Sequence, residues 1–324
     1  MKTVKITPRG YCHGVVNAIN TISNLDFFST KKPIYILGMV IHNKQIVDAL
    51  ANLDLITLHD DSLTRLELLD QIDSGTVIFT AHGVSPKVYE KAKNKGLDII
   101  DTTCVDVLKS QNTIKKLIKN GYTVIFVGKH SHPESEAAKE ISNDVYVVEN
   151  INEIKQLNIE NTLVALTNQT TMSIFDIYYI SEEIKKYFPN IYIVDEICNS
   201  TRIRQEALLT MDSSIDHCFV VGDKLSNNSK KLVEVSVTQA HVDASLIESV
   251  EDINIEKLKL YNKVSVTSGA STPTKVTKEV ITFLEQFDKN NPKTHENKSK
   301  ITASNLLSKK AVQIWTAFLF SSFN

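Results

Sequence analysis

Three of the four cysteines recur along the 324-residue chain at nearly equal intervals. Cys104 lies 92 residues after Cys12, and Cys198 lies 94 residues after Cys104. Each of them follows an extended segment and precedes a stretch with a helical pattern. A unit of roughly ninety residues is larger than a solenoid repeat and long enough for a small α/β domain. The spacing therefore predicts three domains, in agreement with the two or three compact units expected from the length.

Short runs rich in β-branched residues indicate buried strands throughout the chain. These runs include Ile34–Leu37, Thr76–Phe79, Thr123–Val127, Leu163–Leu166, Ile191–Val194, Phe219–Val221 and Val264–Val266. Helical patterns lie between many of the runs, among them Lys87–Lys95, Leu108–Lys119 and Ile180–Tyr187. Strands that alternate with helices predict parallel sheets joined by right-handed crossovers. The expected fold class is α/β, with three similar small domains whose sheets are mostly parallel.

The cysteine spacing also predicts domain boundaries. The first domain is expected over residues 14–103 and the second over 104–197, while residues 1–13 join 198–287 in the third. A polar linker and an extension with no assigned role occupy residues 288–324. Its apolar run, Ala311–Phe320, is shorter than the roughly twenty residues that cross a bilayer, so we do not interpret it as an anchor.

Composition excludes several classes of function. Hydrophobic residues at 42% and charged residues at 23% are typical of a globular protein, and a formal net charge of −2 gives no field for holding nucleic acid. The first residues lack the apolar core of a secretion signal, so a cytoplasmic protein is expected. Cysteines in that reducing compartment are metal ligands, catalytic groups or buried thiols rather than disulfides. Cys218 lies in an apolar run and is interpreted as a small buried hydrophobe.

Two polar clusters follow each of the other three cysteines at similar distances. They are centred on His42 and His82 after Cys12, on His132 and Thr170 after Cys104, and on Ser226 and Ser271 after Cys198. In open parallel sheets the ligand lies beyond the carboxyl ends of the strands. The clusters therefore predict one shared site if the three domains face a common centre.

Cys12, Cys104 and Cys198 are candidate ligands of an iron–sulfur cluster. Zinc fingers use closely spaced ligand pairs, which these three cysteines do not form. A cysteine just ahead of a helix is stabilised as the thiolate by the helix dipole. Since ordinary electron-transfer clusters use four cysteines, a set of three leaves one iron open for substrate, which indicates a redox enzyme. Zinc held by the three cysteines and one histidine remains the alternative.

The polar residues indicate a phosphorylated or diphosphorylated substrate. Imidazole, hydroxyl and amide groups near strand-to-helix turns are suitable hydrogen-bond donors to phosphate oxygens. The chain has no Walker loop and no dinucleotide fingerprint after its first strand, so we expect the electrons to come from a protein donor. Glu134 is the only carboxylate in these clusters and is assigned as proton source for a leaving hydroxyl. Each of these residues also has a structural interpretation, such as a helix cap. Because the residues occur together at repeated offsets, we favour the functional interpretation.

In these motifs the chain resembles the 4-hydroxy-3-methylbut-2-enyl diphosphate reductases of bacterial and plastid isoprenoid synthesis, also called IspH or LytB. The resemblance runs from Met1 to about Phe287. The matching motifs are Gly10-Tyr-Cys-His-Gly-Val15, Ile41-His-Asn43, Ala81-His-Gly-Val-Ser85, Asp101-Thr-Thr-Cys104, His132-Pro-Glu134, Gln169-Thr-Thr171, Ile197-Cys198, Arg204-Gln205 and Gly269-Ala-Ser-Thr-Pro273.

The resemblance implies a trefoil of three α/β domains around one [4Fe–4S] cluster. It implies reduction of the hydroxymethylbutenyl diphosphate to isopentenyl and dimethylallyl diphosphate in the non-mevalonate pathway, with uptake of two electrons and two protons and loss of water. Ferredoxin or flavodoxin is the implied electron donor, and the enzyme is expected to be a monomer that binds neither nucleic acid nor membrane.

The resemblance also implies a role for each matching residue. Cys12, Cys104 and Cys198 match the cluster ligands, Glu134 matches the proton donor, and Thr170 matches a residue near the substrate hydroxyl that assists the proton relay. The diphosphate-binding positions are matched by His42, His82, His132, Ser226, Asn228 and Ser271, with Asn227 as a weaker candidate.

Several positions depart from the family pattern. Val105 stands where proline is usual, Ser200 replaces a small alanine, and in the third-domain loop Leu225 replaces an amide and Asn227 replaces a serine. Asn227 keeps an amide donor for phosphate on a longer side chain. Two other functions stay open from the sequence: a zinc-stabilised protein that binds a phosphorylated ligand without chemistry, and a degenerate reductase that no longer binds diphosphate.

Overall fold

The computed structural model describes residues 1–51, 53–60, 62–302 and 306, and they form two compact units. The central unit comprises Val16–Ile41 and Asp54–Cys198. The terminal unit comprises Met1–Val15, His42–Leu53 and the chain from Asn199 onward.

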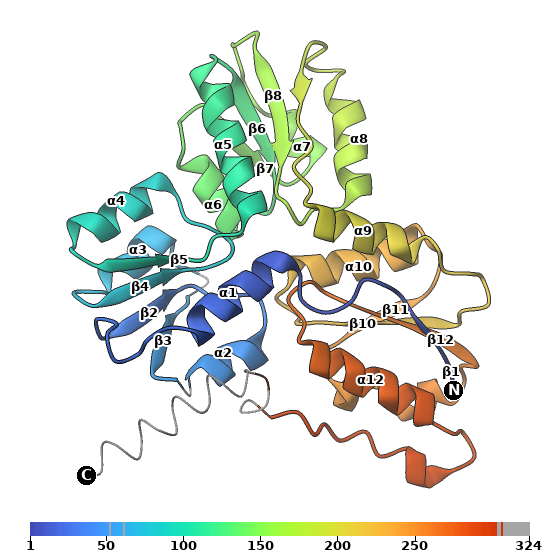
Figure 1. Cartoon of the computed structure of the whole chain (residues 1–324). Helices are drawn as coiled ribbons and strands as arrows, with labels where there is room; N and C mark the ends of the chain where they lie inside the picture. Colours follow the sequence, from blue (N-terminus) through green and yellow to red (C-terminus); the bar gives the residue numbers. More distant parts are fainter. Residues whose placement is uncertain (52, 61, 303–305, 307–324) are drawn as a thin grey trace, which may run out of the picture. The chain divides into compact units, whose positions relative to one another are not determined.

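The central unit contains two four-stranded sheets (Figure 1). Sheet B has the order β3-β2-β4-β5, with strands Leu55–Leu58, Ile34–Leu37, Thr76–Phe79 and Asp98–Asp101. Sheet C has the order β7-β6-β8-β9, with strands Val145–Val148, Thr123–Val127, Val164–Asn168 and Tyr192–Ile193. Neighbouring strands are parallel in both sheets.

The terminal unit contains sheet A, which is also four-stranded and parallel. Its order is β1-β12-β10-β11, with strands Lys2–Lys5, Lys263–Ser268, His217–Val221 and Ala244–Ile247. All three sheets have the same topology when β1 is taken as the fourth strand of sheet A. The first strand in each pairs with the second and third, and the third pairs with the fourth. The N-terminal strand thus occupies the place that β5 and β9 occupy in the other sheets.

Helices connect the strands in every sheet. They are α1 (His13–Ser23), α2 (Lys44–Ala51), α3 (Arg65–Asp70), α4 (Pro86–Asn94), α5 (Val105–Lys119), α6 (Pro133–Lys139), α7 (Ile151–Ile154), α8 (Ile174–Ile184), α9 (Asn199–Leu208), α10 (Asn227–Thr238), α11 (Ile255–Leu258) and α12 (Thr274–Gln286), with short 3-10 turns at Val250–Asp252 and Pro292–Thr294.

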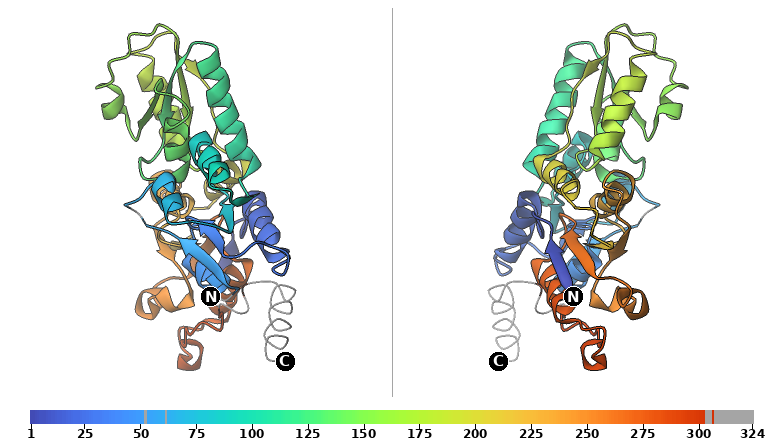
Figure 2. Two further views of the ribbon diagram at one scale, coloured as in Figure 1. Left: turned by 90° about the vertical axis from the view of Figure 1, so that its left-hand side faces the viewer. Right: turned by 90° about the vertical axis from the view of Figure 1, so that its right-hand side faces the viewer.

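Both faces of sheet C are covered, which explains why its central strands, β6 and β8, are buried at every position. Ile125 and Val127 of β6 belong to a buried cluster with Ile177 and Ile180 of α8. Their neighbours along β6 point to the opposite face and pack with residues of α5 and α6. Figures 1 and 2 show α5 and α8 on opposite faces of the sheet.

Helix boundaries follow from local sequence. Ser85 caps α4 by accepting the Val88 N–H, and Pro86 occupies the first turn, where a backbone donor is not needed. Ser173 caps α8 in the same manner. These caps begin each helix just beyond a strand-end loop, which fixes the loops that carry the polar clusters.

The segment after α12 packs, as far as it is described, against α12 and the 3-10 turn at Val250–Asp252. The Asn297 amide donates to the carbonyls of Val250 and Ile253 at 3.1 and 3.0 Å. The Glu279 carboxylate of α12 accepts from the Ser299 hydroxyl and from the Lys300 N–H. A polar composition therefore does not make this segment a free linker.

The predicted fold class is confirmed, since three parallel α/β sheets are present. Every run predicted as a strand overlaps an observed strand. The domain boundaries and the arrangement of the sheets around one centre stay predictions. The apolar run at Ala311–Phe320 lies outside the described residues. Among the described residues, no helix has the length and apolar character needed to cross a membrane.

Candidate functional site

Each of the three spaced cysteines follows the fourth strand of a sheet and immediately precedes a helix. Cys12 comes after β1 and before α1, Cys104 after β5 and before α5, and Cys198 after β9 and before α9. All three side chains are partly exposed. The predicted strand-to-helix setting is thus confirmed, and a thiolate at each position benefits from the positive end of a helix dipole.

The backbone of each cysteine is fixed by the same hydrogen bond. Its N–H donates to a carbonyl in the loop that follows the third strand of the sheet. The bonds join Cys12 to Ala270 (3.0 Å), Cys104 to Ala81 (3.0 Å) and Cys198 to Thr170 (3.1 Å). These loops also carry Ser271, His82 and Thr170, so each cysteine is attached to one of its sheet's polar clusters.

The second polar cluster lies after the first strand of each sheet. His42, His132 and Ser226 each come five positions after the last residue of β2, β6 and β10, respectively. Each sheet therefore presents one cysteine and two polar loops at its carboxyl edge, as the sequence repeat predicts.

Glu134 and Thr170 form a buried pair in the central unit. The Thr170 N–H donates to one carboxylate oxygen of Glu134 and the Thr170 hydroxyl donates to the other, both at 2.9 Å. Only 6% of Glu134 is exposed. Burial raises the pKa of its carboxyl to about 7, and the nearby Asp106 acts in the same direction, while the Thr170 bonds oppose the shift. This carboxyl can hold a proton near neutral pH.

His82 and His132 meet in the central unit although they follow strands of different sheets. Their rings are arranged edge to face, with centroids 5.6 Å apart. His132 caps α6, and its Nδ1 accepts the Glu134 N–H at 3.2 Å. Because Nδ1 accepts this bond, a neutral His132 imidazole carries its proton on Nε2. Nε2 can then donate a hydrogen bond to an anion.

Ser226, Ser271 and His42 meet in the terminal unit. The Ser271 hydroxyl lies 3.1 Å from the His42 carbonyl and 3.4 Å from the Ser226 hydroxyl. Ser226 caps α10 by accepting the Ser229 N–H. The predicted residues Asn227 and Asn228 occupy the first turn of α10 and are buried.

Two glycines allow the start of α10 to lie close to the ends of β10 and β12. A Cβ on Gly222 would lie 2.2 Å from the Ser229 hydroxyl, and one on Gly269 would lie 2.1 Å from the same oxygen. Gly222 follows β10 and Gly269 follows β12. Larger residues at these positions would displace Ser229 and with it the first turn of α10, which Ser226 caps.

The sequence interpretation gave no role to Arg204 and Asp106. The buried Arg204 guanidinium donates to the Gly10 carbonyl at 2.8 Å and to the Ser200 carbonyl, so it joins the loop before Cys12 to the start of α9. The Asp106 carboxylate lies 3.8 Å from the Cys104 sulfur. The sequence signals were their positions within six residues of a spaced cysteine and, for Arg204, its place in a motif that matches the family.

Cys218 is buried in β10, as predicted. It is 0% exposed, and burial raises the pKa of its thiol to about 11. A thiol that resists ionisation is a poor metal ligand. The contrast with the three partly exposed cysteines supports three candidate ligands rather than four.

Two of the residues that depart from the family pattern lie on the surface. Val105 is 64% exposed at the start of α5, and Leu225 is 53% exposed in the loop before α10. Ser200 is buried, and its hydroxyl accepts a bond from Arg204. The side chain that replaces the usual alanine is therefore accommodated by a polar partner.

Comparison with known sequences agrees with this geometry. The sequence model of the LytB protein matches residues 4–285. The chain belongs to the LytB family. Among curated relatives in the LytB family, the 4-hydroxy-3-methylbut-2-enyl diphosphate reductase of Anoxybacillus flavithermus is 47% identical over 311 residues, covering 95% of this chain and 98% of the relative. The reductase of the same name from Bacillus cytotoxicus is 48% identical over 316 residues, covering 97% of this chain and 99% of the relative.

Solved structures of the LytB family match as well. The E-1-hydroxy-2-methyl-but-2-enyl-4-diphosphate reductase of Plasmodium falciparum has a TM-score of 0.81 and 30% identity, with 98% of this chain and 99% of that chain covered. A second structure, of the terminal enzyme of the non-mevalonate pathway, has a TM-score of 0.62 and 26% identity, with 89% of this chain and 100% of that chain covered.

The LytB relatives correct one prediction about the C-terminal segment. An alignment that covers 97% of this chain extends beyond Phe287, although the family's sequence model ends at residue 285. The expectation that the resemblance ends at about Phe287 was wrong. A polar segment that packs through hydrogen bonds carries little motif signal, which is why the sequence alone did not reveal it.

Proposed function

We propose that the chain reduces 4-hydroxy-3-methylbut-2-enyl diphosphate to isopentenyl and dimethylallyl diphosphate, as the last step of the non-mevalonate pathway. Each turnover takes up two electrons and two protons, breaks the allylic C–O bond and releases water. Membership of the LytB family and close similarity to reductases of this name support the activity.

One observation in the central unit carries the chemical argument. Thr170 donates two hydrogen bonds to Glu134, and its own carbonyl accepts the Cys198 N–H. A carboxyl with a pKa of about 7 is therefore connected through one residue to a candidate metal ligand. A proton store held beside a redox centre is what a reductive loss of hydroxide as water requires.

The donor set fits an iron–sulfur cluster. Three partly exposed thiols, each ahead of a helix, are the ligands proposed to hold one [4Fe–4S] cluster: Cys12, Cys104 and Cys198. When bound, such a cluster supplies electrons and a Lewis-acidic iron that activates an allylic hydroxyl. We propose that the three sheets face one centre, as in the trefoil implied by the family, so that the three thiols meet there.

Glu134 is proposed to deliver a proton to the departing hydroxyl oxygen. The Thr170 bonds hold both carboxylate oxygens in fixed positions, and burial keeps water away from them. Once Glu134 has given up its proton, the same two bonds stabilise the carboxylate that remains. Thr170 therefore has a place in the proton relay without being the acid itself.

The diphosphate is proposed to bind to donors from both units. His82 and His132 in the central unit and His42, Ser226 and Ser271 in the terminal unit supply imidazole and hydroxyl groups. Asn227 and Asn228 add amides at the start of α10, where the helix dipole favours an anion. Fixing the diphosphate end orients the hydroxyl end toward Glu134.

The electron donor is proposed to be ferredoxin or flavodoxin, and the enzyme is proposed to act as a cytoplasmic monomer.

The experiment that tests the activity supplies reconstituted protein, under anaerobic conditions, with the hydroxymethylbutenyl diphosphate and dithionite-reduced methyl viologen. Formation of both five-carbon diphosphates supports the proposal. Reconstituted protein that forms neither product would favour the degenerate reductase, and restored turnover in Asn227→Ser would assign that defect to the altered loop.

A further inference from the structure

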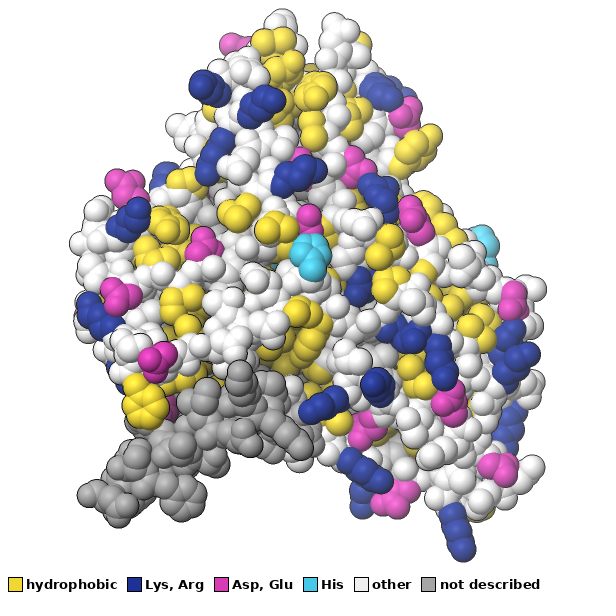
Figure 3. Space-filling model, in the orientation of Figure 1, with side chains coloured by type: hydrophobic (Ala, Val, Ile, Leu, Met, Phe, Trp, Pro, Cys, Tyr) yellow, Lys and Arg dark blue, Asp and Glu magenta, His cyan; other side chains and the backbone are white. Residues whose placement is uncertain are grey.

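Helix α5 exposes an unusual set of side chains to solvent. Its exposed residues, here called the α5 surface, are Val105, Leu108, Lys109, Asn112, Lys115, Lys116 and Lys119. The structure describes every residue of α5, and none of the exposed ones is acidic. Figure 3 shows lysine side chains and apolar side chains together over this helix. The chain as a whole has a formal net charge of −2, so this local excess of cations is not a general property of the surface.

The apolar part of the α5 surface lies next to Cys104. Val105 directly follows that cysteine and is 64% exposed, while Leu108 is 40% exposed one turn later. A shallow depression of about 430 Å³ is lined by both of these residues together with Lys109, Asn112 and Lys116. Exposed aliphatic side chains in a depression favour contact with another molecule.

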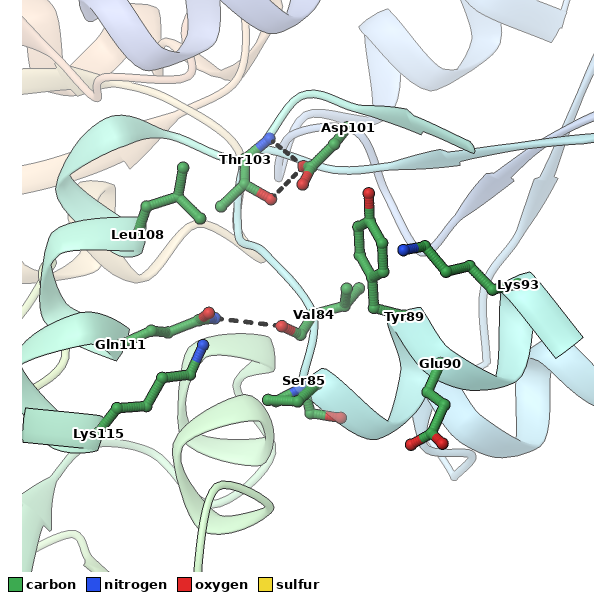
Figure 4. Close-up of a pocket in the computed structure, with 11 residues that line it drawn as sticks. Val84, Ser85, Tyr89, Glu90, Lys93, Asp101, Thr103, Leu108, Gln111 and Lys115 are labelled. Atoms are coloured by element: carbon green, nitrogen blue, oxygen red, sulfur yellow. Dashed lines mark hydrogen bonds between the residues drawn. The ribbon is translucent and has the colours of Figure 1, made fainter. Parts of the chain in front are cut away.

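A second pocket of about 430 Å³ borders the same helix on the side of α4 (Figure 4). Leu108 lines both hollows, and Tyr89, Lys93 and Lys115 line the second. The exposed Asp101 carboxylate also lies in this pocket, where it accepts bonds from the Thr103 N–H and hydroxyl. The α5 surface therefore has an apolar centre with a hollow on either side.

Nearby carboxylates leave much of the positive charge uncompensated. Glu196 is buried and lies 3.4 Å from the Lys109 ammonium group. Asp106 is only partly exposed and lies 3.8 Å from the Cys104 sulfur. Glu90 and Asp101 are exposed carboxylates in the second pocket, where Lys93 and Lys115 also lie. Lys116 and Lys119 add two cations farther along α5.

We infer that the α5 surface is the docking site of the electron-donor protein, an acidic one-electron carrier whose redox group approaches Cys104 over Val105 and Leu108. The inference rests on the proposed function, because it identifies the surface through which the proposed cluster would receive its electrons. Two reduced carriers each lose one electron per turnover and leave oxidised, while the two protons come from Glu134 and solvent.

The chemistry of the α5 surface suits this partner. Electron-transfer complexes are transient and bury little area, so a small apolar centre with charges around it is sufficient. Lysines outside the centre attract a carrier with a carboxylate-rich face and speed its association. Since both apolar residues lie within one turn of Cys104, docking there leaves a short path to the proposed cluster.

The first test uses the reconstituted holoenzyme with Lys115→Glu and Lys116→Glu combined. Neither lysine is assigned to the catalytic machinery. With reduced flavodoxin as donor, we expect KM for flavodoxin to rise about tenfold and its dependence on salt to weaken, since two attractive charges become repulsive. With reduced methyl viologen, a small cationic donor, turnover should stay within about twofold of the wild type.

The matched control reverses two exposed lysines of the terminal unit, Lys257 and Lys278, to glutamate. This variant has the same net charge as the first. An equal rise in its KM for flavodoxin would mean that overall charge, and not the α5 surface, causes the effect, and this would overturn the inference. An unchanged KM in the α5 variant would overturn it as well. Wild-type protein that is inactive with methyl viologen would instead contradict the proposed function.

A second test needs no turnover. Carbodiimide cross-linking joins lysines to carboxylates that are in contact, and mass spectrometry then identifies the lysines of the holoenzyme that are joined to flavodoxin. We expect the cross-links at Lys109, Lys115, Lys116 and Lys119. Cross-links confined to lysines outside α5 and its pocket with α4 would overturn the inference whether or not the enzyme is active.

Discussion

Glu134 has a proton affinity set by two opposing effects. Removal from water favours its neutral form, whereas the two Thr170 bonds favour the ionised form, and the first effect is the larger. The resulting pKa of about 7 suits a group that gives up a proton and regains it at neutral pH.

Replacement of Glu134 by glutamine separates proton delivery from cluster binding. Glu134→Gln keeps the size and the burial of the side chain but cannot donate an acidic proton, so we expect turnover to fall by about a hundredfold or more. Iron content and the visible absorption spectrum should match the wild type. Loss of iron in this variant would contradict the assignment.

In the wild type, kcat should fall as the pH rises above about 7, because the donor must be protonated.

The raised pKa of Glu134 also predicts a pH effect on stability. A carboxyl with a higher pKa in the folded state contributes stability that is fully present below its unfolded value of 4.5 and is lost as the pH rises through about 7. The unfolding free energy of the wild type should therefore fall by about 3 kcal/mol relative to Glu134→Gln between pH 4.5 and pH 7. Denaturant titrations of both proteins across this range measure the difference, and parallel curves would mean that Glu134 is not desolvated.

The four cysteines provide their own matched control. Serine at position 12, 104 or 198 should abolish or strongly reduce bound iron, since each thiol is proposed as a ligand. Cys218→Ser should retain iron, because that thiol is buried in β10. Iron analysis of the four variants after anaerobic reconstitution tests the set, and loss of iron in Cys218→Ser would show that the wrong three were chosen.

Among the elements, the central strands were easier to predict than the edge strands. Strands such as β4 and β6 are buried at every position and are apolar at every position after an initial threonine. Edge strands such as β1 and β5 have an exposed residue at each end and two partly buried residues between them, and their sequences, KTVK and DIID, resemble loops. β1 was also hard to assign because its partner β12 lies at the other end of the chain.

At the turn that begins β4, glycine is required for two reasons. Gly75 has φ of +106°, and a Cβ there would lie 2.2 Å from the Pro33 carbonyl oxygen, which accepts the Thr76 N–H. Gly75→Ala should destabilise the protein by about 3 kcal/mol or more. Gly96 also has a positive φ, +67°, but nothing lies within 4 Å of the place that a Cβ would occupy, so Gly96→Ala should cost about 1 kcal/mol. Thermal unfolding followed by circular dichroism measures both variants, and equal losses would contradict the steric argument.

For the molecule as a whole, the regular cysteine spacing predicted the number of sheets because the sheets share one topology. Each of the first two repeats encodes a complete sheet, and the third encodes three strands of sheet A, whose fourth strand is β1. The polar loops were predictable for the same reason, since they recur after the first and third strands. The role of Arg204 was not, because it contacts Gly10, which is 194 residues away in sequence. Periodicity reveals repeated local structure, but a single contact between distant segments leaves no repeated pattern.

The three-cysteine iron–sulfur site is the claim on which the proposed function and the docking surface both depend. Metal and sulfide analysis of protein purified under anaerobic conditions tests it most directly. We expect a brown protein that contains iron and sulfide in equal amounts and no stoichiometric zinc. Colourless protein with one zinc ion per chain would contradict the claim and would support a zinc-stabilised binding protein instead.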